Sequence, residues 1–181
     1  MSSAARSSPA PRSPARGWIE RLGLAPSSVG GWFGAAMGSD ETVDGAALPS
    51  RFSGPHPLYS SNWYLLEEGQ HLLLHQLAQD ELWFFHVGGP IVLHSFPDSG
   101  PLTVAVGPDP ERGQTLHAAA PHSTWFGAEL EPGAGFALVS CSLGPGWRPS
   151  DPRLPTDDDV DRLSARFPER EELIRRLAAA P

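Results

Sequence analysis

The chain has 181 residues, with 13 basic and 21 acidic side chains, a formal net charge of −8 and one cysteine. This length suits one domain with a sizeable core. No segment gathers lysine and arginine on one face, so the composition argues against nucleic acid or an anionic membrane as a partner. Cys141 has no partner for an internal disulfide, so a cytoplasmic protein is the expectation.

The first sixteen residues are dominated by Ser, Ala, Pro and Arg, with neither an acid nor an apolar run. Such a segment cannot bury a core, so residues 1–16 are predicted to be a disordered tail. An organelle transit peptide has a similar composition and is the competing interpretation. A single domain is then expected over residues 17–181.

The N-terminal part of this domain, residues 17–58, is predicted to be a helix followed by a loop. Trp18–Leu22 has the spacing of a short amphipathic helix, and Gly23 follows it as a stop. Residues 43–57 mix Gly, Pro and Ser with few aliphatic side chains, which indicates an irregular surface segment.

From Tyr59 onward the sequence takes the period of β-strands, with turn residues between successive runs. Short strands at this spacing predict an all-β barrel or sandwich over residues 59–149. The expected strands are Asn62–Glu67, Gln70–Leu77, Glu81–Val87, Ile91–Phe96, Leu102–Val106, Thr115–Ala119, Thr124–Leu130 and Phe136–Ser142.

Residues 150–181 are predicted to form a helical C-terminal extension. Three consecutive acids, Asp157 to Asp159, suit the positive end of a helix. A second helix is expected over Glu169–Ala180, where Leu173, Ile174 and Leu177 share one face. Both helices are expected to pack on the outside of the β-structure.

The hairpin between Gly69 and Gly88 carries the most informative spacing. His75 and Leu77 are two residues apart in one expected strand, and Glu81 begins the next. Since alternate residues of a strand face the same side, His75 and position 77 point together into the interior, and Glu81 joins them across the hairpin.

This spacing resembles the first signature of the cupin superfamily, in which a second histidine stands at the position of Leu77. The second cupin signature supplies another histidine where this chain has Phe126, after Pro121. The resemblance implies a cupin-type β-barrel, also called a double-stranded β-helix or jelly roll. Of the expected donors only His75 and Glu81 remain, fewer than the three or four that a transition metal usually needs. We therefore expect no metal cofactor, with a divalent metal as the alternative.

Further motifs resemble one cupin branch of unsettled function, sometimes called cupin-five, whose barrel is similar to that of the sugar-nucleotide epimerases. The resemblance covers nearly all of residues 18–180 and implies a homodimer paired through strand edges. The matching elements are Leu22–Pro26, Val29–Phe33, Tyr64–Leu66, His75, Asp80–Trp83, Gly88, Gly113, Pro121, Trp125–Phe126 and Cys141–Trp147.

The expected catalytic residues are His75, Glu81 and His117. In this hypothesis His75 takes a proton from the substrate, Glu81 orients or charge-stabilises the imidazole, and His117 returns a proton from a facing strand. The alternative for His75 and Glu81 is a buried, hydrogen-bonded pair that only fixes the core. His117 is equally compatible with a surface position at a strand end.

Aromatic and apolar side chains are expected to wall the cavity and bind the substrate. Trp83 and Phe85 lie on the same face of their strand as Glu81, and Leu77 and Phe126 stand at the two positions of missing metal ligands. Packing in the core is the alternative role for each of these side chains. The predicted substrate-binding residues are Trp63, Leu77, Trp83, Phe85, Trp125 and Phe126.

Three functions remain open at this point. The first is a metal-independent enzyme, such as an isomerase, epimerase or cyclase, that transfers a proton on a small-molecule substrate. The second is a small-molecule binding or sensor protein without catalysis. The third is a divergent metal-dependent enzyme that uses His75, Glu81 and His117.

Overall fold

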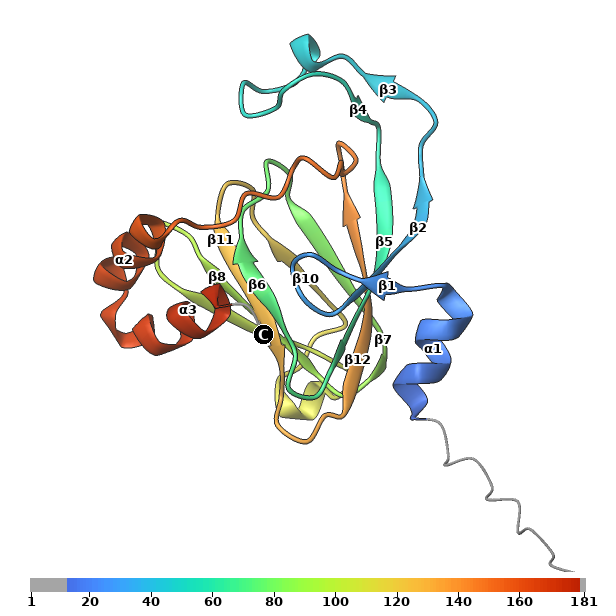
Figure 1. The fold of residues 1–181 in the computed structure, drawn as a ribbon, viewed down its shortest axis with the longest axis vertical. Coiled ribbons are helices and arrows are strands. Elements are labelled where there is room, and N and C mark those ends of the chain that lie inside the picture. Colours follow the sequence, from blue (N-terminus) through green and yellow to red (C-terminus); the bar gives the residue numbers. More distant parts are fainter. Residues whose placement is uncertain (1–12, 180–181) are drawn as a thin grey trace, which may run out of the picture.

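The computed structural model describes residues 13–179, and its centre is formed by two facing β-sheets (Figure 1). The larger sheet has the strand order β1 (Ala25–Pro26), β2 (Trp32–Gly38), β5 (Ser60–Glu67), β12 (Phe136–Leu143), β7 (Glu81–Gly88) and β10 (His117–Ala120). The smaller sheet has the order β6 (His71–His75), β11 (Trp125–Leu130), β8 (Ile91–Phe96) and β9 (Leu102–Val106).

A third, two-stranded sheet stands apart from these layers. It pairs β3 (Thr42–Val43) with β4 (His56–Pro57) and projects beyond the end of the main sheets (Figure 1). Residues 13–179 also contain three single-turn 3-10 helices, at Gly45–Ala47, Pro110–Arg112 and Pro168–Arg170.

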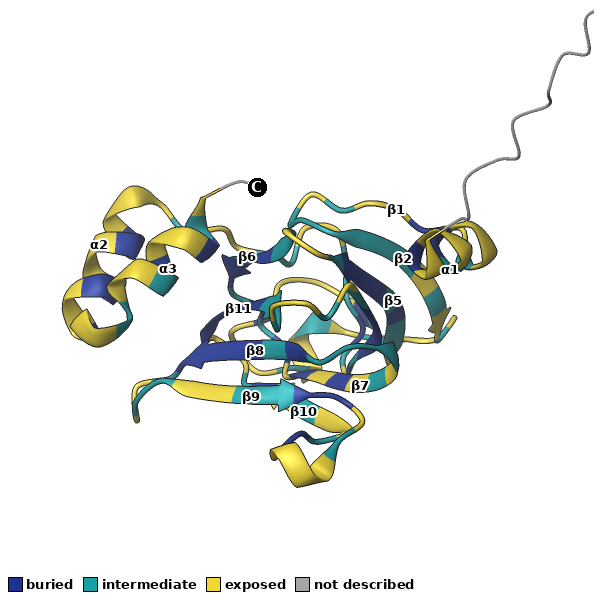
Figure 2. Cartoon of the chain, turned by 90° about the horizontal axis from the view of Figure 1, so that it is seen from below, coloured by how far each residue is buried: buried dark blue, intermediate teal, exposed yellow. Residues whose placement is uncertain are grey.

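The main core lies between the two large sheets, and β7 shows most clearly how one face of a strand is directed into it. In β7, Glu81 and Trp83 are buried while Leu82 and Phe84 face solvent, the period of two that a pleated strand imposes. Figure 2 shows buried stretches along β5 and β7 of the larger sheet and along β8 of the smaller one. This arrangement directs one face of each sheet toward a shared interior.

In the part of the chain that the structure describes, three α-helices cover the outer faces of the sheets. Helix α1 (Pro14–Leu22) begins where the Ser13 side chain accepts a hydrogen bond from the amide of Arg16, and it ends at Gly23 in the left-handed conformation. Its buried Ile19 packs with Leu65 and Leu138 on the outside of the larger sheet.

The C-terminal helices α2 (Asp157–Arg166) and α3 (Glu171–Ala178) cover the smaller sheet (Figure 1). Thr156 and Asp159 form a capping box at the start of α2. The fully buried Ile174 and Leu177 of α3 belong to the core cluster that also contains Trp125. The expected packing of these helices on the outside of the β-structure is therefore confirmed.

The eight strands expected after Tyr59 correspond to β5 through β12, and the expected all-β fold class is confirmed in strand content. Closure into a barrel is wrong, because the two large sheets are separate ladders rather than one continuous ring. The expected loop over residues 17–58 also contains β2, which pairs antiparallel with β5. Of the expected disordered tail, residues 1–12 lie outside the described residues, and helix α1 already begins at Pro14.

Candidate functional site

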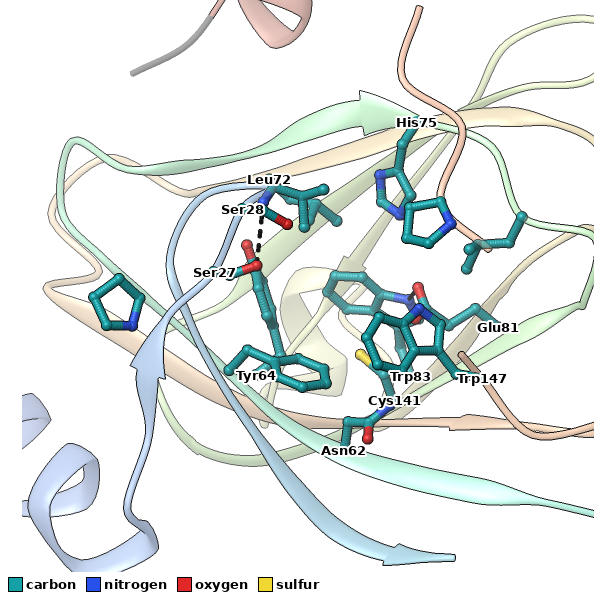
Figure 3. A pocket seen from close by; sticks show the side chains of 15 residues that line it. Ser27, Ser28, Asn62, Tyr64, Leu72, His75, Glu81, Trp83, Cys141 and Trp147 are labelled. Atoms are coloured by element: carbon teal, nitrogen blue, oxygen red, sulfur yellow. Dashed lines mark hydrogen bonds between the residues drawn. The ribbon is translucent and has the colours of Figure 1, made fainter. Parts of the chain in front are cut away.

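A cavity of about 330 Å³ lies between the two large sheets (Figure 3). Its volume is at the small end of the roughly 300–1,000 Å³ range of ligand sites. The lining is mostly apolar and aromatic. It consists of Pro26, Ser27, Ser28, Val29, Phe33, Asn62, Tyr64, Leu72, His75, Leu77, Glu81, Trp83, Cys141, Trp147 and Pro152.

His75 is the last residue of β6 and is 4% exposed. Its Nδ1 donates a hydrogen bond of 2.7 Å to the carbonyl oxygen of Leu73, and its ring centroid lies 4.2 Å from that of Phe126. Since a carbonyl oxygen only accepts, Nδ1 carries the proton and Nε2 is left as an acceptor. Burial lowers the pKa of His75 to about 4, although the bond to Leu73 opposes the shift. The imidazole is therefore neutral at pH 7.

Glu81 is the first residue of β7 and is 9% exposed. Its Oε2 accepts a hydrogen bond of 2.9 Å from the indole Nε1 of Trp83. Burial raises the pKa of Glu81 from its ordinary value of 4.5 to about 7, while the Trp83 bond acts in the opposite direction. The carboxyl group can therefore either give or accept a proton near neutral pH.

The expected contact between these two groups is not present. Within residues 13–179, His75 and Glu81 form neither a hydrogen bond nor an ion pair with each other. The prediction that Glu81 orients the imidazole is therefore wrong, because the Leu73 carbonyl and the Phe126 ring hold it instead. Both groups still line the same cavity.

A loop from β1 to β2 lies along one side of the cavity. The backbone N–H of Leu73 donates a hydrogen bond to the carbonyl oxygen of Val29. The hydroxyl of Tyr64 donates a hydrogen bond of 2.9 Å to the carbonyl oxygen of Gly30. Gly30 has φ +89°, and a Cβ there would lie 2.2 Å from the carbonyl oxygen of His71. Only glycine fits at this position, so the loop is held close against β5 and β6.

Cys141 lies on β12 at the wall of the cavity and is buried. Burial raises the pKa of its thiol well above the ordinary value, and the nearby Glu81 carboxyl acts in the same direction. Because the thiolate is the nucleophilic form, the structure gives no basis for thiol chemistry here.

The cavity position expected for His117 is wrong. This residue is exposed on β10, where its ring centroid lies 6.4 Å from that of the solvent-facing Phe84. Its strand faces outward at this point, so His117 cannot return a proton to a substrate in the cavity.

Four of the expected substrate-binding aromatics also lie away from the cavity lining. Trp63 points to the opposite face of β5, where it contacts the ring of His86. Trp125 belongs to the cluster under the C-terminal helices. Phe85 packs against the main core. The ring of Phe126 packs against the imidazole of His75. The expected Leu77 and Trp83 do line the cavity.

Several lining residues have no counterpart in the sequence-based expectation. Asn62 and Tyr64 alternate on β5, so the strand period places them on one face, but the sequence does not indicate which face is interior. Phe33 comes from the strand β2, which lies in a range predicted to be loop, and Trp147 follows the end of β12.

The residues present do not fit a transition-metal site. Among residues 13–179, no group of three or more His, Cys, Asp or Glu side chains is placed to hold a metal ion. The two positions where the cupin signatures would supply histidines carry Leu77, which lines the cavity, and Phe126, which packs on His75. The donors at this cavity therefore do not support a metal-dependent reaction step.

Residues 16–154 match the family model described as "Cupin superfamily (DUF985)". The chain belongs to this cupin family. The family resemblance drawn from the sequence is thereby confirmed, and the fold and cavity described above are those of a member whose family has no established activity.

Solved structures extend the comparison over almost the whole cupin chain. A hypothetical protein from Leishmania major is 28% identical, with a TM-score of 0.79, and the match covers 92% of this chain and 99% of that one. A protein from Shewanella oneidensis is 26% identical, with a TM-score of 0.77 and coverage of 94% and 100%. A cupin-2 domain from Rhodospirillum rubrum, at 16% identity, a TM-score of 0.50 and coverage of 87% and 91%, shows likeness of fold alone.

The comparison with curated proteins found no match. Within the described part of this cupin, no helix is long and apolar enough to cross a membrane.

Proposed function

We propose that this cupin binds a small organic molecule in the cavity and transfers a proton on it without a metal, as an isomerase, epimerase or cyclase does. One observation carries the proposal: a buried carboxyl group, Glu81, faces a mostly apolar cavity with a pKa of about 7. A carboxyl group buried only to fill space would cost stability, whereas a general acid–base catalyst needs a pKa near the working pH.

Glu81 is the group that moves the proton in this proposal. As a carboxylate it takes a proton from an acidic C–H bond of the substrate, and as the resulting carboxylic acid it gives this proton back to another atom of the bound substrate. The bond from Trp83 fixes the carboxyl group in one orientation, which reduces the motion needed at each transfer.

His75 has a second role, as a neutral hydrogen-bond acceptor. Its Nδ1–H is committed to Leu73, so Nε2 is free to accept a hydrogen bond from a hydroxyl or amine of the substrate. With a pKa of about 4, His75 is a weak base at neutral pH, and this favours positioning over proton abstraction. The apolar walls exclude water from the reacting atoms.

Solvent-deuterium incorporation tests the proposal even though the substrate is unidentified. The full chain is incubated with a mixture of small metabolites in D₂O, and mass spectrometry follows deuterium at carbon-bound positions. The wild type should label at least one compound, and Glu81→Gln should abolish the labelling. The exposed His117→Ala serves as the matched control and should label as the wild type does.

Two results would contradict the proposal. Labelling that survives Glu81→Gln would remove this carboxyl group from the reaction. A compound that co-purifies with the wild type but gains no deuterium would favour a binding or sensor protein instead.

The expected homodimer and cytoplasmic location stay predictions. Sedimentation at two protein concentrations would test the dimer, and imaging of the tagged full chain would test the location.

A further inference from the structure

Four aromatic rings surround the cavity. Phe33 and Trp147 have ring centroids 5.3 Å apart, and Tyr64 and Trp83 have centroids 5.9 Å apart at an interplanar angle of 66°. Figure 3 shows Tyr64, Trp83 and Trp147 around the same space as Glu81. Because the faces of aromatic rings carry negative partial charge, such a group attracts a compact cation.

The charged groups at the cavity have the matching sign. No lysine or arginine is among the lining residues, and His75 is neutral at pH 7. Glu81 is the acidic side chain of the lining. An anionic ligand would lose its hydration without gaining a positive partner, so the cavity disfavours phosphates and carboxylates.

Other buried carboxylates of this chain have arginine partners, and Glu81 does not. The Asp151 side chain, 4% exposed, pairs with Arg148 at 3.1 Å. The Asp159 side chain, 7% exposed, pairs with Arg153 at 2.7 Å. Within residues 13–179, Glu81 receives only the neutral N–H of Trp83. A buried carboxylate without a cation is costly, and a positively charged ligand would supply the missing partner.

We infer that the ligand of the cavity is an organic cation of the alkylammonium class, held by the aromatic rings and by Glu81. The inference rests on the proposed function in one respect, namely that the cavity is the ligand site. The ammonium group lies among Phe33, Tyr64, Trp83 and Trp147 and next to the Glu81 carboxylate. Binding then favours the ionised form of this carboxyl group, so affinity for the cation increases as the pH rises.

Three probes of similar shape separate charge from size. Choline carries the cation, 3,3-dimethylbutan-1-ol replaces its nitrogen with carbon, and 3,3-dimethylbutanoate carries a negative charge. Isothermal titration calorimetry with the full chain at pH 8.5 should show choline binding at least roughly tenfold tighter than the neutral alcohol. The anion should bind more weakly than either. At pH 5.5 the affinity for choline should fall, while that for the alcohol should stay the same.

Two variants and one control assign the effect to the site. Glu81→Gln should remove most of the preference for choline and retain binding of the alcohol, and Trp147→Leu should weaken choline more than the alcohol. His117→Ala, on the outer face, should leave all three affinities unchanged.

The inference is overturned if the alcohol binds as tightly as choline at pH 8.5, or if none of the probes binds. Deuterium incorporation that depends on Glu81 would still support the proposed function in either case. A choline preference without any such incorporation would leave the cation site and remove the reaction.

Discussion

His75 and Glu81 should have opposite effects on how stability depends on pH. Burial raises the pKa of Glu81 from 4.5 to about 7, so the folded state binds this proton more tightly than the unfolded state. Its contribution to stability is fully present below pH 4.5 and is lost as the pH rises to 7. At about 1.4 kcal/mol per pH unit, the loss is about 3 kcal/mol.

The pKa of His75 shifts by a similar amount in the other direction, from 6.5 to about 4. The unfolded state binds this proton more tightly, so the contribution of His75 is present above pH 6.5 and is lost as the pH falls to 4. Its size is also about 3 kcal/mol. Between pH 4.5 and 6.5 the two slopes therefore nearly cancel in the wild type.

Single substitutions should reveal each slope. Glu81→Gln keeps the shape of the side chain, and its stability relative to the wild type should increase by about 3 kcal/mol from pH 4.5 to 7. His75→Asn keeps a donor for the Leu73 carbonyl, and its relative stability should decrease by about 3 kcal/mol from pH 4 to 6.5. Urea unfolding at half-unit pH intervals measures both. If the variants show the wild-type pH profile, the two groups are not desolvated as described.

Three further predictions concern the loop at the cavity, the packing of helix α3 and the hydrogen bond to Glu81. Gly30→Ala should destabilise the fold by more than about 3 kcal/mol, because its Cβ meets a backbone carbonyl oxygen, whereas Gly133→Ala, with φ +79° and open space, should cost only about 1–2 kcal/mol in the same urea assay. Leu177→Ala removes a fully buried side chain and should cost about 2–5 kcal/mol, against less than about 0.5 kcal/mol for the exposed Leu154→Ala. Trp83→Phe removes the hydrogen bond from the indole to Glu81 and should raise the pKa of Glu81 further, which ¹³C NMR titration of this carboxyl group would detect. An unchanged pKa would contradict the role of the bond.

The strands can be predicted from the sequence because each is a local pattern bounded by turn residues. For Ile91–Phe96 and Leu102–Val106, the predicted bounds are those that the structure has. Strand β2 is not predicted because Trp32–Gly38 is rich in small residues and lacks β-branched ones. Its strand character comes from pairing with β5, a long-range contact that a local pattern does not contain.

The site can be predicted only where residues are tied to one hairpin. Leu77 and Trp83 are placed by their two-residue spacing from His75 and Glu81, and all four line the cavity. Trp125 is a candidate for its aromatic side chain alone, although it is out of phase with Phe126, and the neighbouring residues of a strand point to opposite faces. The loop that contains Val29 lines the cavity because it packs against β6. No spacing within the sequence indicates this long-range contact.

The apolar residues at the two positions where the cupin signatures have donors are buried together with the polar groups that remain. Phe126 packs its ring on His75, and Leu77 and Glu81 line the same mostly apolar cavity, so both polar groups are buried where few donors replace their lost water. Desolvation favours the neutral form of each, and this lowers the pKa of His75 and raises that of Glu81. An apolar cavity wall therefore fits both observations, the shortage of metal donors among the described residues and a carboxyl group with a pKa of about 7.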